Sequence, residues 1–255
     1  MSAEKAIRAQ ARMTLKGGWL KAITALIAVL TVFAVADCVY TVLALLLISG
    51  DNADNTVNQV IFYITEPTLV FAVSFLLSPV FNGYVRLYYK ASVDGVYHIE
   101  DLIYYFSKEH YRSALAVNIR FIIRMLLPTV VCFLPVIIFW AVFMKSKENI
   151  PLYALCEFML TVLSSLLTVL WSLRYFAVFA AAVEFEYMDA PELFKLSKEI
   201  MRGNTGTVSR LILSFSPWLL LCMTVLPVIY VAPYMTQALC ISSKWLIRSR
   251  FEIYD

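Results

Sequence analysis

Charged side chains inside long apolar runs are the residues of this sequence best placed to do chemistry. Arg124 and Arg174 lie in the halves of their runs nearer the basic connecting segments, and Asp37, Glu66 and Glu157 lie in or near the opposite halves. A charge at membrane depth is costly, so it usually pairs with another group, faces water or marks a functional site. Because the acids and the arginines lie at different depths, we expect neither a buried ion pair nor a proton relay between them.

Two interpretations of Arg124 and Arg174 remain open. In the first, they line a cytoplasm-facing polar pocket between two spans, suited to an anionic lipid headgroup or an anionic metabolite. In the second, their long side chains snorkel to the interface and contact carbonyl and hydroxyl groups. Asp37 is a candidate buried acid, protonated and hydrogen-bonded to a neighbouring helix.

Motifs of soluble enzymes do not occur in this sequence. The two histidines, His98 and His110, lack the spacing of a zinc site, and none of the five cysteines forms a CxxC pair. Phosphate-binding glycine loops and nucleophile motifs are also missing. We therefore expect no enzyme, no catalytic residue, no metal and no cofactor. The chain is no basic soluble domain, so we expect no nucleic-acid partner either.

Composition places these residues in a multi-pass membrane protein. Of 255 residues, 61% are hydrophobic and 15% charged, whereas soluble domains carry roughly 45–50% and about 25%. The final apolar block is too long for one crossing, so we expect two spans joined near Pro227, with Pro227 and Pro233 interrupting it; one kinked helix plus a re-entrant piece is the alternative. The predicted fold is all-α: a single integral membrane domain, 1–255, with six transmembrane helices. The spans are expected at 20–49, 67–88, 115–144, 152–183 and, as a pair, within 211–247.

Lysine and arginine set the expected orientation. They gather in the N-terminal segment, in the segments after the second and fourth spans, and in the C-terminal tail, whereas 51–60 has none. Positive charge favours the cytoplasmic side. We therefore expect a cell-membrane protein with both termini in the cytoplasm.

Three cytoplasmic segments are predicted to form short amphipathic helices, each before an odd-numbered span. Each lies in the membrane interface, docks on the protein's own span ends, or does both. In the N-terminal helix, one face carries Arg8, Arg12 and Lys16, and the opposite face carries Ala3, Ala6, Ile7 and Met13. The second presents Ile99, Leu102, Ile103 and Phe106, with Asp101 off that face. The third begins at Asp189, presents Ala190, Leu193, Phe194, Ser197, Ile200 and Met201, and ends at Gly203-Asn204.

The order of helix, odd span and even span recurs three times. The repeats are expected at about 2–90, 96–183 and 188–250, with similar junctions such as "LKGGW" and "IMRGNTG". A true repeat and convergence of interfacial loops both remain open.

The C-terminal third carries a family resemblance. "SKEIMRGN", then "LILSFSPW" and "APY", resembles a family of bacterial integral membrane proteins named domain of unknown function 975, and "ARMTLKGGW", with Arg12 and Trp19, resembles its start. The resemblance implies a multi-pass membrane protein and no particular activity. The matching signature residues are Ser197, Glu199, Met201, Arg202, Gly203, Asn204, Ser214, Phe215, Trp218, Pro233 and Tyr234.

Two functions are consistent with these residues. The first is a non-enzymatic membrane protein that organises or senses the bilayer or supports a partner complex, indicated by the surface helices. The alternative is a small transporter or lipid-handling protein with a cytoplasm-facing anion or headgroup pocket, indicated by the arginines and the interrupted last block. The expected partner is the lipid bilayer, including its anionic headgroups. The sequence identifies no protein partner.

Overall fold

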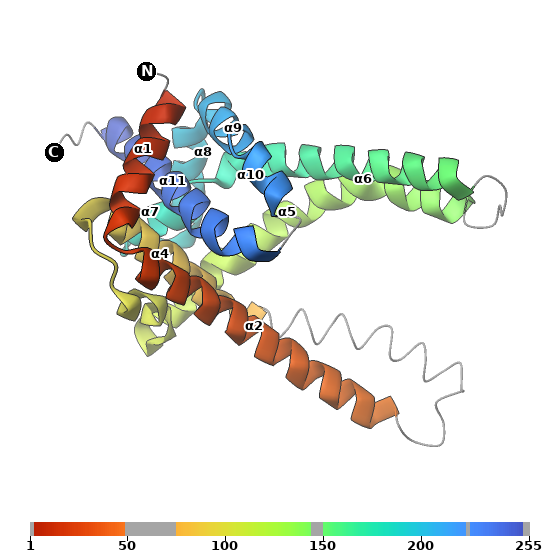
Figure 1. The fold of residues 1–255 in the computed structure, drawn as a ribbon, viewed down its shortest axis with the longest axis horizontal. Coiled ribbons are helices and arrows are strands. Elements are labelled where there is room, and N and C mark those ends of the chain that lie inside the picture. Colours follow the sequence, from red (N-terminus) through yellow and green to blue (C-terminus); the bar gives the residue numbers. More distant parts are fainter. Residues whose placement is uncertain (1–2, 49–74, 144–149, 223–224, 252–255) are drawn as a thin grey trace. The chain divides into compact units, whose positions relative to one another are not determined.

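The computed structural model describes residues 3–48, 75–143, 150–222 and 225–251, and within these ranges every regular element is a helix (Figure 1). The chain divides into two compact units. The first comprises Met1–Asn118 and Phe215–Lys244, and the second comprises Ile119–Ser214 and Trp245–Asp255. Each unit therefore contains residues from distant parts of the sequence.

The first unit is built around α4 (Ser78–Asp94), in which eleven of seventeen residues are buried. Helices α1 and α2 and the short 3-10 helices η1 and η2 pack against it. The remaining pieces are the start of α5, α10 and most of α11. The bounds are α1 Ala3–Lys16, α2 Trp19–Ile48, η1 Ile99–Leu102, η2 Tyr104–Phe106, α5 Lys108–Phe143, α10 Ser216–Leu221 and α11 Val225–Phe251.

The second unit contains the rest of α5, then α6, η3, α7, α8 and α9. Helix α8 packs against α7 and η3, and α9 also contacts η3. In Figure 1, α6 extends away from α8 and α9. The bounds are α6 Ile150–Ser172, η3 Leu173–Tyr175, α7 Val178–Glu184, α8 Ala190–Met201 and α9 Thr205–Leu213.

Three stretches of the described chain are long and apolar enough to cross a membrane: Trp19–Val39, Lys108–Val142 and Leu152–Glu184. In the most apolar window of Lys108–Val142, no residue is buried inside the protein. These stretches match the first, third and fourth predicted spans. The second predicted span, 67–88, lies partly outside the described residues, as does Glu66.

The last apolar block differs from the prediction. It forms two short helices, α9 and α10, followed by the long α11. Pro227 lies in the first turn of α11, where a missing N–H does no harm. Pro233 lies inside α11, so the expected interruption there is wrong. The count of six spans stays a prediction, because neither α9 nor α10 is long enough for a crossing.

Of the three predicted surface helices, the third forms with the predicted apolar face, and its place at a membrane surface stays a prediction. All six residues of its predicted apolar face are buried, and Gly203 has φ of +89° just after its end, the left-handed conformation that glycine favours. That face packs against α7 and η3, which is the docking alternative. In α1, Ile7 of the predicted face is buried together with Ala11 and Leu15. Ala3, Ala6 and Met13 are exposed, so their place in the membrane interface stays a prediction.

The second predicted surface helix differs in type, because the segment forms 3-10 helices and not an α-helix; a place in the membrane interface for its exposed apolar residues stays a prediction. Residues 99–106 form η1 and η2, and Ile99, Ile103 and Phe106 are exposed. Asp101 is buried instead, because its carboxylate Oδ1 lies 3.0 Å from Nε of the buried Arg86 on α4. That long-range ion pair fixes which side of the segment faces inward.

The expected single domain, 1–255, and the three expected repeats stay predictions. The borders of the two compact units fall at 118, 214 and 244, which are not the borders of the repeats.

Candidate functional site

Arg124 projects from α5 into the second unit at half-buried exposure. Its guanidinium carbon lies 4.2 Å from the ring centroid of Phe194 on α8 and 5.8 Å from that of Tyr175 on η3. One turn earlier on α5, Phe121 packs on Phe179 of α7 at 5.3 Å between centroids. This face of α5 is therefore held against α7, η3 and α8, and the arginine stacks on an aromatic ring, as guanidinium groups favour.

Arg174 lies on η3 and its side chain is exposed. Its guanidinium carbon lies 4.0 Å from the ring centroid of Trp171. Its backbone carbonyl accepts a hydrogen bond from the hydroxyl of Ser197 on α8, at 3.3 Å. Ser197 is fully buried, so this bond fastens α8 to the turn that carries Arg174.

The two arginines lie at a similar level, because the Arg124 guanidinium reaches the ring of Tyr175, the neighbour of Arg174. They stack on different rings, so a single pocket shared by both stays a prediction. Within the described residues, neither side chain has a hydrogen-bond acceptor or a carboxylate partner.

A third arginine, Arg86, is buried and provides a contrast. Arg86 in the first unit also stacks on an aromatic ring, with its guanidinium carbon 3.5 Å from the centroid of Tyr104. It additionally has the Asp101 carboxylate at 3.0 Å, which Lys90 approaches to 3.6 Å. The fold thus supplies an internal anion to Arg86 and, among the described residues, none to Arg124.

The helix bounds show how far each arginine lies from the charge-free part of its apolar stretch. Helix α5 continues for nineteen residues from Met125 to Phe143 without a charged side chain, about 28 Å at 1.5 Å per residue. That length matches the roughly 30 Å hydrocarbon core of a bilayer. Helix α6 ends at Ser172, two residues before Arg174. Arg124 therefore directly precedes a charge-free length sufficient for one bilayer crossing, whereas Arg174 lies inside Leu152–Glu184, which is itself long and apolar enough to cross; the depth of both arginines stays a prediction.

Asp37 lies on the described part of α2 with its side chain exposed. Its backbone carbonyl accepts a hydrogen bond from the Thr41 hydroxyl at 2.9 Å. The neighbouring predicted span lies partly outside the described residues, so burial of this acid against another helix stays a prediction.

The signature residues of the C-terminal third occupy structural positions. Met201 is buried, Gly203 supplies the left-handed turn, and the Asn204 side-chain amide donates to the Ile200 carbonyl at 2.8 Å, closing the end of α8. Glu199 and Arg202 are exposed.

The signature residues Phe215, Trp218 and Tyr234 belong to an aromatic cluster in the first unit, whereas Ser214 follows the end of α9 in the second unit. The buried ring of Tyr234, next to Pro233 on α11, packs edge-on against the buried Phe215 at 5.2 Å. The Arg12 guanidinium lies 5.4 Å from the same Tyr234 ring. Tyr230, one turn earlier, stacks on Trp19 at 4.6 Å and lies 6.3 Å from Trp218. The two ends of the sequence that carry the resemblance therefore meet in one core.

A buried tyrosine network in the first unit was not predicted from the sequence. The Tyr97 hydroxyl donates to Oε1 of the buried Gln237 at 2.8 Å, and the Lys21 ammonium donates to the Tyr97 carbonyl at 3.1 Å. The Tyr88 hydroxyl donates to the Ala22 carbonyl at 3.1 Å. Burial raises the pKa of the Tyr97 phenol above its usual range, so the phenol remains a donor at neutral pH. The cluster of tyrosines in "GYVRLYYK" was the available signal.

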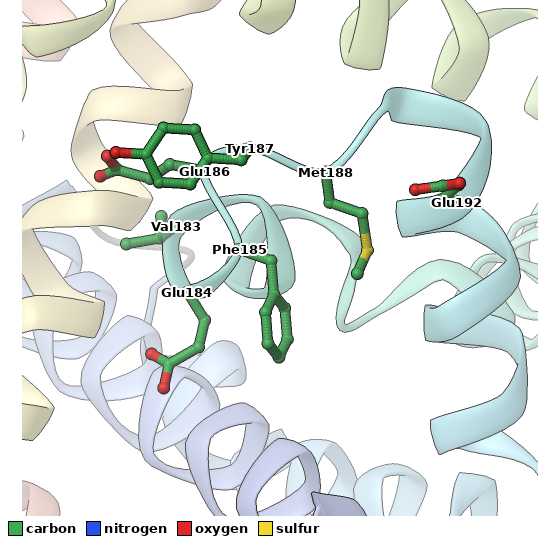
Figure 2. A pocket seen from close by; sticks show the side chains of 7 residues that line it. All are labelled: Val183, Glu184, Phe185, Glu186, Tyr187, Met188 and Glu192. Carbon is green, nitrogen blue, oxygen red and sulfur yellow. The ribbon is translucent and has the colours of Figure 1, made fainter.

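An open depression lies where α7 turns into α8 (Figure 2). Glu192 on α8 stands across it from Glu186 and Tyr187 of the turn, and Phe185 and Met188 also line it. It contains neither Arg124 nor Arg174. Across the described ranges, no group of three or more histidine, cysteine, aspartate or glutamate side chains is arranged to hold a metal ion.

Comparison with known proteins gives one family. Residues 1–243 match the model of the family described as "Protein of unknown function (DUF975)", so the chain belongs to that family. No curated protein and no solved structure matches the chain.

Proposed function

We propose that this chain is a multi-pass cell-membrane protein with a non-enzymatic role, which senses or organises the bilayer through packed helices at the cytoplasmic membrane surface. If a protein binds the same surface, the role of this chain would be to support a partner complex. Both termini are placed in the cytoplasm, following the distribution of lysine and arginine.

The contrast between α5 and α8 carries this proposal. Beyond Arg124, α5 presents apolar side chains that the protein leaves exposed, as expected of a helix solvated by lipid. Helix α8 is short, charged on one side and fully packed on the other. Because Arg124 on α5 stacks on Phe194 of α8, the helix that enters the apolar layer directly contacts the surface helix. A change in the position or charge of the bilayer surface therefore has a physical route to α8.

The test measures deuterium uptake by the amides of α8. The protein is reconstituted in vesicles of phosphatidylcholine alone and in vesicles containing phosphatidylglycerol. We expect α8 to exchange more slowly in the anionic vesicles, while the buried amides of α4 in the first unit serve as the internal control. The sensing role would be refuted if deuterium uptake by α8 were the same in phosphatidylcholine vesicles, in vesicles containing phosphatidylglycerol and in vesicles of different acyl-chain length.

Orientation is tested separately with single-cysteine variants on a cysteine-free background. A cysteine at Glu192, exposed on α8, should react with a membrane-impermeant maleimide only after the cytoplasmic side is opened. A cysteine at Asn52, which lies outside the described residues, should react in intact cells. The reverse pattern would overturn the proposed topology.

A further inference from the structure

We propose that Arg124 binds the phosphate group of a membrane phospholipid and that Phe194 holds the guanidinium in position for it. This inference rests on the proposed function and names its ligand.

The first argument is the state of the Arg124 side chain. A guanidinium carries five N–H donors in one plane, and a ring stacked on its face satisfies none of them. The Phe194 ring occupies the face at 4.2 Å, and no described residue accepts from the edge. A half-buried cation needs an acceptor, and the oxygens of water or of an anion at the membrane surface are the groups available to it.

The second argument is the contrast with Arg86. Both arginines stack on an aromatic ring, but Arg86 has Asp101 at 3.0 Å along its donor edge. A carboxylate and a phosphate present similar oxygen pairs to a guanidinium, which binds either in a bidentate manner. Arg124 has the same stacked geometry without the internal anion, so an external phosphate would complete it.

The third argument is depth. Nineteen uncharged residues follow Arg124 on α5, and the apolar helix α6 ends just before Arg174. Both arginines therefore lie where α5 and α6 would leave the hydrocarbon layer, and phospholipid phosphates lie at that level. Arg174 lies at a level similar to that of Arg124 and could contact the same headgroup layer. It belongs to a separate aromatic stack, because its guanidinium lies on Trp171.

The coupling to α8 follows from the same contacts. A phosphate bound to the Arg124 guanidinium would hold the plane of that guanidinium in place over the Phe194 ring. Phe194 is buried, and Ser197, one turn later, bonds the η3 carbonyl of Arg174. The bound lipid would therefore slow the opening of α8, which is the response described under the proposed function.

The test measures retention of phosphatidylglycerol by the full-length protein in detergent, using native mass spectrometry. We expect Arg124→Gln to lower the apparent affinity roughly tenfold, the loss expected when a charge-assisted hydrogen-bonded pair is removed. Arg124→Lys should recover little, because an ammonium lacks the planar paired donors. Phe194→Leu should also weaken retention while keeping an apolar side chain on α8. Arg112→Gln is the control, since it removes the same charge from an exposed position on the same helix.

Three comparisons decide the outcome. Equal loss in Arg124→Gln and Arg112→Gln would overturn the site, because general charge attraction would then account for retention. Retention of phosphatidylcholine with the same Arg124 dependence supports recognition of the phosphate itself. Displacement of the lipid by millimolar inorganic phosphate, again only with Arg124 present, supports the phosphate site but identifies the free anion as its occupant, whereas no displacement identifies the lipid.

A separate readout distinguishes failure of this inference from failure of the proposed function. If α8 of the unmodified protein responds to the bilayer in deuterium exchange and Arg124→Gln responds equally, the phosphate site is refuted and the sensing role stands. If lipid retention depends on Arg124 but α8 does not respond to the bilayer, the site stands and the sensing role is refuted.

Discussion

Gly83 lies at a close approach between α4 and η1, and its substitution by alanine should destabilise the first unit. A Cβ atom at this position would lie 2.1 Å from the Leu102 carbonyl oxygen and 2.7 Å from its carbonyl carbon. Carbon–oxygen contacts normally begin near 3.3 Å, so η1 would have to retreat by about 1 Å. Both atoms belong to the backbone, which cannot rotate away as a flexible side chain could.

The magnitude follows from three contributions. Overpacking costs about 1–3 kcal/mol. The retreat of Leu102 also pulls Asp101 away from Arg86, and loss of a buried ion pair costs up to about 3–5 kcal/mol. Alanine in a helix returns about 0.5–1 kcal/mol relative to glycine. Because a displacement of about 1 Å weakens the ion pair without removing either partner, only part of that second cost applies, about 2 kcal/mol. We therefore expect Gly83→Ala to lower the free energy of unfolding by about 2–4 kcal/mol, and Tm by about 4–16 °C at about 2–4 °C per kcal/mol.

The assay is thermal unfolding of the detergent-solubilised protein, followed by reaction of a thiol dye with Cys240 in a variant that keeps only this cysteine. Cys240 is buried and its thiol lies 3.9 Å from the Val85 carbonyl oxygen, two residues from Gly83. Gly206→Ala is the matched control: no atom lies within 4 Å of its Cβ position in α9, so its Tm should be unchanged or slightly higher. A Gly83→Ala protein as stable as the Gly206→Ala protein would refute the argument.

Three further substitutions test the described contacts. Asp101→Asn should cost about 3–5 kcal/mol, because the buried Arg86 loses its carboxylate; Glu100→Gln, an exposed neighbour, is the control, and equal Tm values would contradict the expectation. Tyr97→Phe should cost about 1–3 kcal/mol by leaving the buried Gln237 oxygen without its donor. Because burial raises the pKa of Tyr97, the phenol ionises at a lower pH in the unfolded chain than in the folded protein. The free energy of unfolding should therefore fall above about pH 10, and it should fall less steeply with pH in Tyr97→Phe. Identical alkaline denaturation curves for the two proteins would count against this. Gly203→Ala should cost about 1 kcal/mol or more, because φ is +89° there, and should speed deuterium exchange at the end of α8; unchanged exchange there would show that the turn tolerates alanine.

The sequence was most informative where local periodicity and packing agree. In α8, apolar residues recur at helical spacing, proline follows Asp189 at the start and glycine follows at the end, so face and bounds could both be predicted. The apolar stretches of α2, α5 and α6 were equally plain, because length and composition identify them without knowledge of any contact.

Prediction failed where a contact between distant residues decides the local structure. Apolar residues at 99, 102, 103 and 106 fit an α-helical face, but a run of eight residues is too short for periodicity to exclude 3-10 turns. Asp101 was placed off the apolar face because it falls outside that helical spacing. Its partner Arg86 lies fifteen residues earlier, on another helix, and no local pattern reveals such a pair.

The surroundings of Arg174 show a second limit of reasoning from the sequence. Counting residues from the edges of an apolar run placed Arg124 and Arg174 well inside the membrane. The run containing Arg174 is not one regular α-helix: α6 ends at Ser172, the 3-10 helix η3 follows, and apolar residues of α7 are buried inside the second unit. Apolar composition alone does not distinguish a lipid-facing segment from a buried core segment, and here the two adjoin.

The aromatic cluster explains why the two recognisable parts of the sequence lie at opposite ends of the chain. Arg12 and Trp19 come from the N-terminal part, and Phe215, Tyr230 and Tyr234 come from the C-terminal part. The Tyr234 hydroxyl also donates to the Arg8 carbonyl at 3.5 Å, across 226 residues of sequence. Because the buried rings of Phe215 and Tyr234 pack on each other, and Arg12 covers the second, neither end can complete this core alone. The matched region, residues 1–243, ends one residue before the C-terminal segment of the first unit does. The signature residues Arg12, Trp19, Phe215, Trp218 and Tyr234 are therefore accounted for by one folded core. The signature residues from Ser197 to Asn204 lie on and just after α8 in the second unit, the helix that also carries the Phe194 ring against Arg124.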